Sequence, residues 1–273
     1  MNNKHSLHRL VLPLTLVAAA SLTACGGGGS DTSTDTPSTS AKGISLQGVA
    51  SKGLMANADV KVHPIRADGG VDTATVLASA TTDATGHYSL SFDGTAAQPY
   101  VIRVSAKADG STTHLDEVTG TAQPLPAGFV MRTLFTPTQT GTTTASASIT
   151  PFSEMAVSAA ERATGGVTAA NAAQAVSTVT QLLGFDPTTV TAKTAVTASS
   201  DDEKKLAVML AAVSQMAASD QLGCSTGSGG DKTTCVVEKL AASASTSTLK
   251  LSSAGGSTSG DVSSALTTAL TSV

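Results

Sequence analysis

The sequence predicts an α+β protein in which an antiparallel β-sandwich is followed by an all-α helical domain. Residues 44–148 contain short segments that alternate apolar and polar residues, separated by Asp-Gly turns, which is typical of strands. After residue 149 the apolar residues recur at every third or fourth position, which is typical of helices. We therefore expect a β-sandwich over residues 44–148 and a helical domain over residues 149–273.

Six segments of the first half have the pattern of strands. In one of them Tyr88, Leu90 and Phe92 alternate with polar residues, so one face of the strand is apolar. The turn before it contains Asp83, whose side chain can cap the turn, and Gly86, which can take a positive φ. Short strands at this spacing are typical of a sandwich. The predicted strands cover residues 44–49, 59–65, 76–82, 87–92, 100–106 and 129–135.

Two motifs of this half match a known kind of module. They are GVASKGLMANADVKV (48–62), a strand start followed by a small-residue turn, and ATTDATGHYSLSF (80–92), a hairpin. On these motifs residues 44–107 resemble the carboxypeptidase regulatory-like, or transthyretin-like, β-sandwich. The resemblance implies an accessory module without catalytic residues, in a broader fold that includes glycan binders. An exposed pair of Tyr88 and Tyr100 would favour glycan binding, although the chain has no Trp.

The second half is predicted to contain five helices. Thr150 is placed to cap the first helix, and Pro151 stands at its first helical position. Ser200 and Glu203 have the spacing of a capping box, and Gly184 follows the last apolar residue of the second helix. The predicted helices begin at residue 151, cover 169–183, begin at residue 201, and cover 234–244 and 262–271.

Three short motifs also recur in a known kind of helical region. They are ITPFSEMA (149–156), Ala-Asn at 170–171 and LLGFDP (182–187). On these motifs the second half is similar to the all-helical region often found after a β-module in bacterial surface lipoproteins. This similarity implies an architecture and no particular activity. We expect Asn171 and Asp186 to be capping or turn residues rather than ligands.

Residues 1–24 have the order of an export signal. Lys4 and Arg9 precede an apolar run, and small residues end this run before Cys25. The run is shorter than the roughly 20 residues of a membrane-spanning helix. The segment Leu-Thr-Ala-Cys (22–25) resembles the lipobox of bacterial lipoproteins, which implies that Cys25 becomes the first mature residue. The resemblance implies a diacylglyceryl group and usually an N-acyl chain such as palmitate on this cysteine, and two or more chains anchor a protein stably.

The residues after Cys25 bear on where such an anchor would lie. In the lipoprotein family an Asp directly after the cysteine tends to retain the protein in the inner membrane, and here this residue is Gly26. The resemblance therefore implies the outer membrane of a Gram-negative cell, with the protein facing either the periplasm or the cell surface. Residues 26–43 are mostly Gly, Ser, Thr and Asp, so residues 25–43 predict a lipidated cysteine on a flexible tether.

The two remaining cysteines, Cys224 and Cys235, enclose a loop of ten residues. Their spacing does not match a C-x-x-C redox or zinc site, and no His lies nearby to complete a metal site. In an oxidising compartment the pair predicts a local disulfide, and free thiols are the main alternative.

The charge of the chain argues against two classes of partner. The chain has 16 basic and 20 acidic residues, and two of the basic ones, Lys4 and Arg9, lie in the predicted signal. The mature chain is therefore acidic, and it contains no long run of either sign. We expect neither nucleic acid nor an anionic lipid surface as an electrostatic partner.

Few residues offer catalytic or metal-binding chemistry. The segment GCSTG (223–227) matches G-x-S-x-G, but a predicted helix precedes Ser225 and no His follows it, so we expect no nucleophile there. His63 and His87 are expected to be surface or strand residues. His114 with Asp116 and Glu117 could bind a metal weakly, but alternation along a strand would place only His114 and Asp116 on one face, without a third ligand. No P-loop, dinucleotide or zinc-protease motif occurs. We therefore expect no catalytic, cofactor-binding or metal-binding residues, and no cofactor.

Together these observations predict a non-enzymatic, lipid-anchored protein of the cell envelope, with a binding or structural role at the outer membrane. Its partners would be membrane lipid, through the acylated Cys25, and an unknown protein or glycan ligand. One alternative is a glycan-binding module that acts through the β-sandwich. The other is an enzyme with an unrecognised site, for which His63, His87, His114 and acidic residues would have to meet in the fold.

Overall fold

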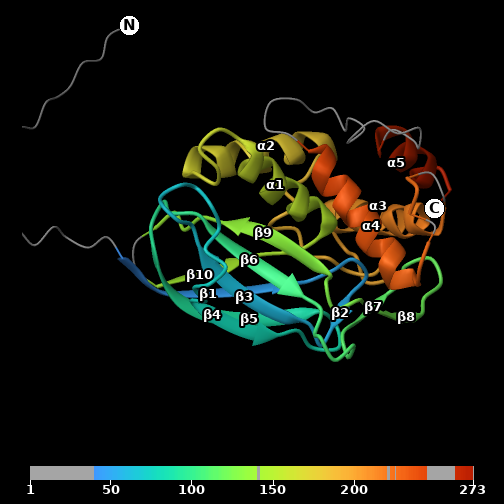
Figure 1. Ribbon diagram of the computed structural model, residues 1–273, viewed down its shortest axis with the longest axis horizontal. Coiled ribbons are helices and arrows are strands. Elements are labelled where there is room, and N and C mark those ends of the chain that lie inside the picture. Colours follow the sequence, from blue (N-terminus) through green and yellow to red (C-terminus); the bar gives the residue numbers. More distant parts are fainter. Residues whose placement is uncertain (1–39, 140–141, 220–221, 225, 245–261, 273) are drawn as a thin grey trace, which may run out of the picture. The chain divides into compact units, whose positions relative to one another are not determined.

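The computed structural model describes residues 40–139, 142–219, 222–224, 226–244 and 262–272. The chain divides into two compact units, Met1–Ser38 and Thr39–Val273, and all of the described residues belong to the second unit. This unit has mixed α and β content, with three sheets and five helices among its described residues, and the helices lie in the C-terminal half of the chain (Figure 1). The predicted α+β class is confirmed at this level.

The described strands are β1 (Ser40–Val49), β2 (Met55–Ala56), β3 (Asp59–Pro64), β4 (Ala78–Thr81), β5 (His87–Thr95), β6 (Tyr100–Ser105), β7 (Thr113–Leu115), β8 (Ala122–Pro124), β9 (Val130–Phe135) and β10 (Thr143–Ser146). Their order is β10-β1-β5 in one sheet, β4-β3-β6-β9 in another and β2-β7-β8 in a third. The pairing of β1 with β10 is parallel, and the other pairings between these strands are antiparallel.

Each of the six predicted strands overlaps an observed strand. The strands that the sequence did not predict, β2, β7, β8 and β10, have two to four residues each. Segments of this length are too short to show an alternation of apolar and polar residues. The predicted turn before β5 is confirmed, because the Asp83 side chain accepts hydrogen bonds from the backbone N–H groups of Thr85 and His87, and Gly86 has a φ of 79°.

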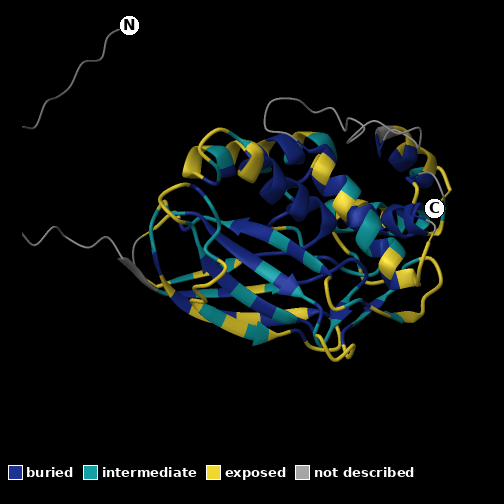
Figure 2. Ribbon diagram, viewed as in Figure 1, coloured by how far each residue is buried: buried dark blue, intermediate teal, exposed yellow. Residues whose placement is uncertain are grey.

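The two larger sheets share one buried apolar cluster. The residues of β5 alternate between buried and exposed, so one face of this strand is turned inward and the other toward solvent (Figure 2). The cluster joins the inward residues of β1 and β5 to residues of β3, β6 and β9, among them Leu46, Leu90, Val62, Ile102 and Met131. The burial of these side chains is the main force that holds the two sheets together.

A second apolar cluster joins the β4-β3-β6-β9 sheet to the helices. Val101 of β6 and Leu134 of β9 pack in this cluster with residues of all five helices, and α1 contacts β9 directly (Figure 1). The helices are α1 (Pro151–Arg162), α2 (Ala169–Leu183), α3 (Asp201–Ala218), α4 (Gly229–Ser243) and α5 (Val262–Leu270). The sheet is therefore covered on one face by β1 and β5 and on the other by helices.

The capping signals in the sequence place most of the helix ends. Thr150 caps α1, and its hydroxyl accepts a hydrogen bond from the backbone N–H of Ser153. Ser200 and Glu203 form the predicted capping box of α3. The helix α2 ends at Leu183, and the capping residue Gly184 has a φ of 77°, in the left-handed region that glycine tolerates best. These three predictions are confirmed.

The start of α4 differs from the prediction. The sequence indicated a helix from residue 234, whereas α4 begins at Gly229. Ser228 and Asp231 form a capping box at this point, and the two oxygens satisfy backbone N–H groups that are otherwise unpaired. Local capping therefore outweighs the poor helix propensity of the glycines that follow Ser228.

Candidate functional site

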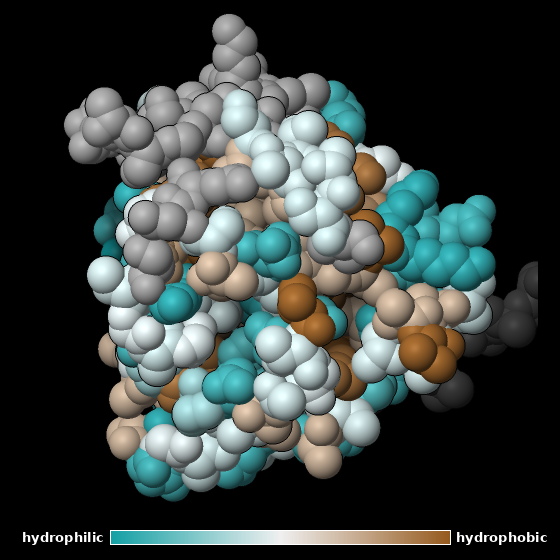
Figure 3. Space-filling view, turned by 90° about the vertical axis from the view of Figure 1, so that its right-hand side faces the viewer, coloured by the Kyte–Doolittle hydropathy of each residue, from teal (hydrophilic) through white to brown (hydrophobic). Residues whose placement is uncertain are grey.

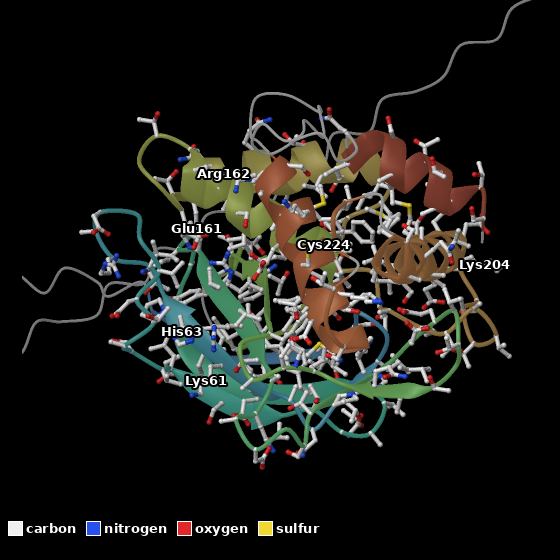
Figure 4. The ribbon with its side chains drawn as sticks, turned by 45° about the vertical axis from the view of Figure 1, so that its right-hand side comes forward. Lys61, His63, Glu161, Arg162, Lys204 and Cys224 are labelled. Carbon is white, nitrogen blue, oxygen red and sulfur yellow. A yellow bond between two sulfur atoms is a disulfide. The ribbon has the colours of Figure 1, made fainter. Side chains whose placement is uncertain are left out.

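Cys224 and Cys235 form a disulfide, as predicted. The bond ties the segment after α3 to α4, and Cys224 is buried (Figure 4). Cys25 and Ser225 lie outside the described residues. The lipidation of Cys25 therefore stays a prediction.

Lys52 is the centre of a buried polar cluster that the sequence analysis did not predict. Its side chain is fully buried in the turn between β1 and β2. The ammonium nitrogen Nζ donates to Glu117 Oε2 at 3.1 Å and to Ser214 Oγ at 2.6 Å, and the Ser214 hydroxyl donates to the same Glu117 oxygen at 2.7 Å. The three side chains come from the β1–β2 turn, the loop after β7, and α3, so the cluster connects segments that are far apart in the sequence.

The turn that places Lys52 depends on a glycine. Gly53 has a φ of 65°, and a Cβ atom at this position would overlap the carbonyl oxygen of Leu115 at the end of β7. Only glycine allows this close approach. The close approach of Gly53 to Leu115 packs the β1–β2 turn against β7. It also places the Lys52 ammonium next to the Glu117 carboxylate.

His114 in β7 completes the surroundings of Lys52. Its ring is buried, and Nδ1 lies 2.9 Å from the backbone carbonyl oxygen of Lys52, to which it donates a hydrogen bond because a carbonyl oxygen only accepts. Burial, together with the nearby Lys52 charge, lowers the pKa of His114 to about 4. The ring is therefore neutral at pH 7. Its Nε2 atom and Glu117 Oε1 are buried acceptors without a hydrogen-bond partner among the described residues.

The hydrogen bonds of this cluster are those of a structural connection. A nucleophilic serine needs a neighbouring base that takes its proton. Here the Ser214 hydroxyl already donates to Glu117, and it accepts from Lys52, which is a donor in this geometry. Because Ser214 is also buried in the middle of α3, the arrangement favours a clamp between helix and sheets over a catalytic dyad.

A cavity of about 220 Å³ lies beside this cluster. One wall contains Glu117 and Leu115 from the β7 end, and another contains Leu210 from α3. The segment with Lys193 and the exposed Val196 forms its rim. On the face that Figure 3 shows, apolar side chains lie among hydrophilic ones and do not form one continuous patch. The cavity is small and mostly apolar, and the Lys193 ammonium pairs with Glu203 at 2.8 Å, so this cation is already neutralised.

A second charged cluster joins α1 to β9. The Arg132 guanidinium binds both oxygens of Glu154, with Nε at 3.0 Å from Oε2 and Nη2 at 2.6 Å from Oε1. Its Nη1 atom donates to Glu161 Oε1 at 2.6 Å. These hydrogen bonds and the two negative charges outweigh the effect of burial and raise the pKa of Arg132. Glu161 and Arg162 at the end of α1 are shown above the sheet in Figure 4.

A larger cavity, of about 340 Å³, lies next to this second cluster. Its floor is formed by β6 and β9, and α4 forms the opposite wall. Arg103 and Arg132 line it on the sheet side, and Glu154 and Glu238 line it on the helix side. This cavity therefore contains both signs of charge.

The three histidines of the predicted mature chain have separate partners. The His63 ring bonds to the backbone carbonyl of Thr75, the His87 ring to the hydroxyl of Thr85, and the His114 ring to the carbonyl of Lys52. Within the part of the chain that the structure describes, no group of three His, Cys, Asp or Glu residues is placed to hold a metal ion. The histidines thus do not form a shared site with one another.

The two tyrosines do not form an exposed pair. Tyr88 and Tyr100 are both buried in the cluster between the sheets, and each hydroxyl has a backbone partner. The condition that would favour a sugar platform on these two rings is therefore not met. Their inward position follows from the alternation in β5 and from the edge-on contact of Tyr100 with Phe92, whose ring centres lie 5.1 Å apart.

Two other residues act as the sequence indicated. The Asn171 side-chain amide donates to the backbone carbonyls of Thr164 and Gly166 and closes the turn before α2. The Asp186 carboxylate accepts from the backbone N–H and the hydroxyl of Thr188 in the turn after α2. Both are turn residues, as predicted.

Comparisons with known proteins provide only a partial structural similarity. No protein-family model and no curated protein matches the chain. A 9R-lipoxygenase from Cyanothece PCC8801, known from a crystal structure, matches over 43% of this chain and 18% of that chain, with 12% sequence identity and a TM-score of 0.20. A similarity at this level supports no statement about function. Separately, none of the helices in the described ranges is long and apolar enough to span a membrane.

Proposed function

We propose that this chain is a lipid-anchored protein of the bacterial cell envelope with a binding or structural role. The Cys224–Cys235 disulfide is the observation that supports this location most directly, since disulfides form and persist in oxidising compartments outside the cytosol. The chain has three cysteines, and this bond leaves Cys25 as the third. An odd cysteine behind an export signal is the position that lipidation uses in lipoproteins.

The anchor would be built from the first 43 residues. Residues 1–24 would be removed as a signal peptide, and Cys25 would carry the acyl chains that hold the protein in the outer membrane. Residues 26–43 would be the tether, whose Gly, Ser and Thr content favours a flexible chain. Anchoring at a single terminus leaves the folded body free to reach a partner.

The folded body would be an antiparallel β-sandwich of the carboxypeptidase regulatory-like kind, over residues 44–148, with a helical domain over residues 149–273. The apolar cluster between the β1–β5 pair and the β3, β6 and β9 strands supports a sandwich, since facing sheets bury their inner residues against each other. The cluster between Val101, Leu134 and the helices supports a helical layer that packs on this sandwich.

A binding or structural role is favoured over catalysis by the way polar groups are used. Lys52, Ser214 and one oxygen of Glu117 hydrogen-bond to one another, and Arg132 is held by Glu154 and Glu161. Both clusters join helices to sheets. The rigid body that they stabilise is suited to presenting a surface or a cavity to a ligand.

Metabolic labelling with an alkyne-bearing fatty acid tests the anchor. We expect the wild-type chain to carry the label and to fractionate with the outer membrane, and Cys25→Ser to lose both. The chain with Cys224→Ser and Cys235→Ser is the matched control, which should keep the label although it lacks the disulfide. A Cys25→Ser chain that still carries the label, or a wild-type chain that fractionates as soluble protein, would refute the proposal.

Protease treatment of intact cells that carry a C-terminally tagged chain then distinguishes the two faces of the outer membrane. Digestion without lysis indicates the cell surface and favours ligand capture from outside. Protection until the outer membrane is opened indicates the periplasm and favours a scaffold or accessory role.

A further inference from the structure

The hairpin formed by β7 and β8 lies next to β2 (Figure 1). Each of its strands has three residues, and His114 is the one buried residue in them, since the others are exposed or half-buried. The burial of apolar side chains, which holds the two larger sheets together, therefore contributes little to these two strands. Their attachment to the rest of the fold depends on the histidine.

The hairpin is fixed at its base and held less firmly beyond it. Thr112 and Leu125 flank the hairpin and are buried, and the Leu125 N–H donates to the Thr112 carbonyl oxygen at 3.0 Å. Beyond this base β7 pairs with the two residues of β2, and Glu117 after β7 bonds to Lys52 and Ser214. A short element with few apolar contacts can open locally while the larger sheets stay folded.

The position of His114 suits only a neutral ring. Nδ1 donates to the backbone carbonyl oxygen of Lys52, and Nε2 is buried without a hydrogen-bond partner among the described residues. A proton on Nε2 would create a buried donor without an acceptor, and the charge of the Lys52 ammonium would oppose it. Both effects cost free energy as long as the ring stays in place.

The groups around the ring compensate little for such a proton. Its partners across the strands are Met55 in β2 and Gln123 in β8, and neither side chain titrates. The Asp116 charge favours the protonated ring, but one oxygen of this carboxylate already accepts three hydrogen bonds within its own turn. The Glu117 carboxylate pairs with the Lys52 ammonium. A protonated ring is therefore more stable outside this position, in contact with water.

We propose that the β7–β8 hairpin is a flap that acid releases: protonation of His114 frees β7 from the β1–β2 turn and opens the adjoining cavity of about 220 Å³. The hairpin contributes Leu115 and Gly120 to the wall of this cavity, and α3 contributes Leu210 and Ala211. Because α3 also packs against α4 and α5, it stays in place when the flap moves. This inference concerns access to the cavity and does not depend on the lipid anchor.

Hydrogen exchange of the full chain in detergent, at pH 7 and pH 5, tests the proposal. The reporter is the Leu115 N–H, which donates to the Leu54 carbonyl oxygen at 3.3 Å and is exposed when the flap opens. The pKa of His114 is about 4 in the closed state and 6.5 in water, so the open fraction should rise about twentyfold from pH 7 to pH 5. The protection factor of this amide, corrected for the pH dependence of the exchange chemistry, should fall by the same factor.

Two comparisons show that the opening is local and is caused by His114. At pH 5 the Leu115 amide should be at least about tenfold less protected than the amides of β6, which lies between two strands of its sheet. His114→Asn can donate to the Lys52 carbonyl but takes up no proton, so protection should not change with pH. His87→Asn, which removes an exposed histidine of β5, is the matched control and should keep the twentyfold change.

Each other outcome would overturn the proposal. If the Leu115 amide keeps its protection at pH 5, acid does not release the hairpin. If it is then as protected as β6, the hairpin opens only by global unfolding. An equal fall in His114→Asn, or no fall in His87→Asn, would assign the effect to another group. If His114→Asn does not fold, His114→Gln replaces it. The exchange does not involve Cys25, so its failure is distinct from a failure of the anchor.

Discussion

Two charged clusters lie where helices meet sheets, and their charges are paired differently. In the Lys52 cluster one ammonium faces one carboxylate, and Ser214 bonds to both. Lys61 of β3, Arg103 of β6 and Arg132 of β9 lie directly opposite one another on neighbouring strands, and the carboxylates of Glu154 and Glu161 both pair with Arg132. In the first cluster the buried ammonium is therefore paired directly with a carboxylate, whereas in the second Arg103 makes no direct ion pair among the described residues and only the nearby Glu154 charge acts on it.

Burial explains why the protein tolerates this difference. Lys52 is fully buried, and a fully buried charge is stable only when it is paired and hydrogen-bonded. Arg103 borders a cavity, where water can solvate a guanidinium that lacks a carboxylate. A complete pair at a buried position indicates a structural role.

The largest expected effect is that of Lys52→Met. The change keeps most of the side-chain volume but leaves the Glu117 carboxylate without its counter-charge, and breaking a buried pair in this way costs about 3–5 kcal/mol. The free energy of unfolding from urea titration measures this loss. Lys205→Met is the matched control, because it breaks an exposed pair with Asp202 that contributes about 0–1 kcal/mol. Equal losses in the free energy of unfolding would mean that the buried Lys52–Glu117 pair stabilises the fold no more than an exposed ion pair does.

The next effect is a pH dependence caused by His114. The folded chain takes up this proton only below about pH 4, whereas the unfolded chain takes it up below about 6.5. Unfolding therefore binds a proton between these values, and stability falls as the pH is lowered from 6.5 to 4. At 1.36 kcal/mol per pH unit the loss approaches about 3 kcal/mol.

The control for this pH effect is His114→Asn, whose amide can still donate to the Lys52 carbonyl. Carboxylates that titrate in the same range contribute equally to both chains, so the difference between the two unfolding profiles isolates His114. We expect the difference to grow as the pH falls below 6.5. Parallel profiles from pH 7 to 4 would contradict the buried, neutral state of this ring.

A smaller difference in stability is expected between variants of Arg132 and Arg103. Arg132→Gln leaves two carboxylates without their cation, one of them almost fully buried, and should cost about 2–3 kcal/mol. Arg103→Gln removes a like charge directly opposite Arg132 and should leave stability unchanged or raise it slightly. Thermal unfolding of the two variants gives both values. A loss from Arg103→Gln as large as that from Arg132→Gln would show that Arg103 has a structural role.

Local signals in the sequence were sufficient for much of the fold. The capping residues Thr150 and Ser200 and the glycine at 184 define helix ends through hydrogen bonds and φ preferences that involve only near neighbours. The alternation in residues 87–92 likewise identified the inward face of β5. The parallel pairing of β1 with β10 was not predictable, because β10 is short and its partner lies about a hundred residues away in the chain.

The charged clusters were not predictable for the same physical reason. Lys52 lies among small residues in a turn, which is the usual setting of an exposed lysine, and Ser214 is one polar residue on a mostly apolar helix. Only the approach of α3 to the β1–β2 turn makes them partners. Arg103 follows three buried apolar residues in β6, and its lack of a direct carboxylate partner depends on residues of β9 and α1.

The smallest effect is expected from single hydroxyl groups in the two clusters. Ser214→Ala removes a donor to Glu117 and an acceptor for Lys52 but keeps their ion pair, so the loss should be about 1–2 kcal/mol. Ser158→Ala removes a comparable buried donor to Glu154, whose two oxygens are already bound by Arg132, and should cost less. Urea titration of both variants at pH 7 measures the difference. If Ser158→Ala costs as much as Ser214→Ala, a hydroxyl contributes the same whether or not its carboxylate is already bound by an arginine.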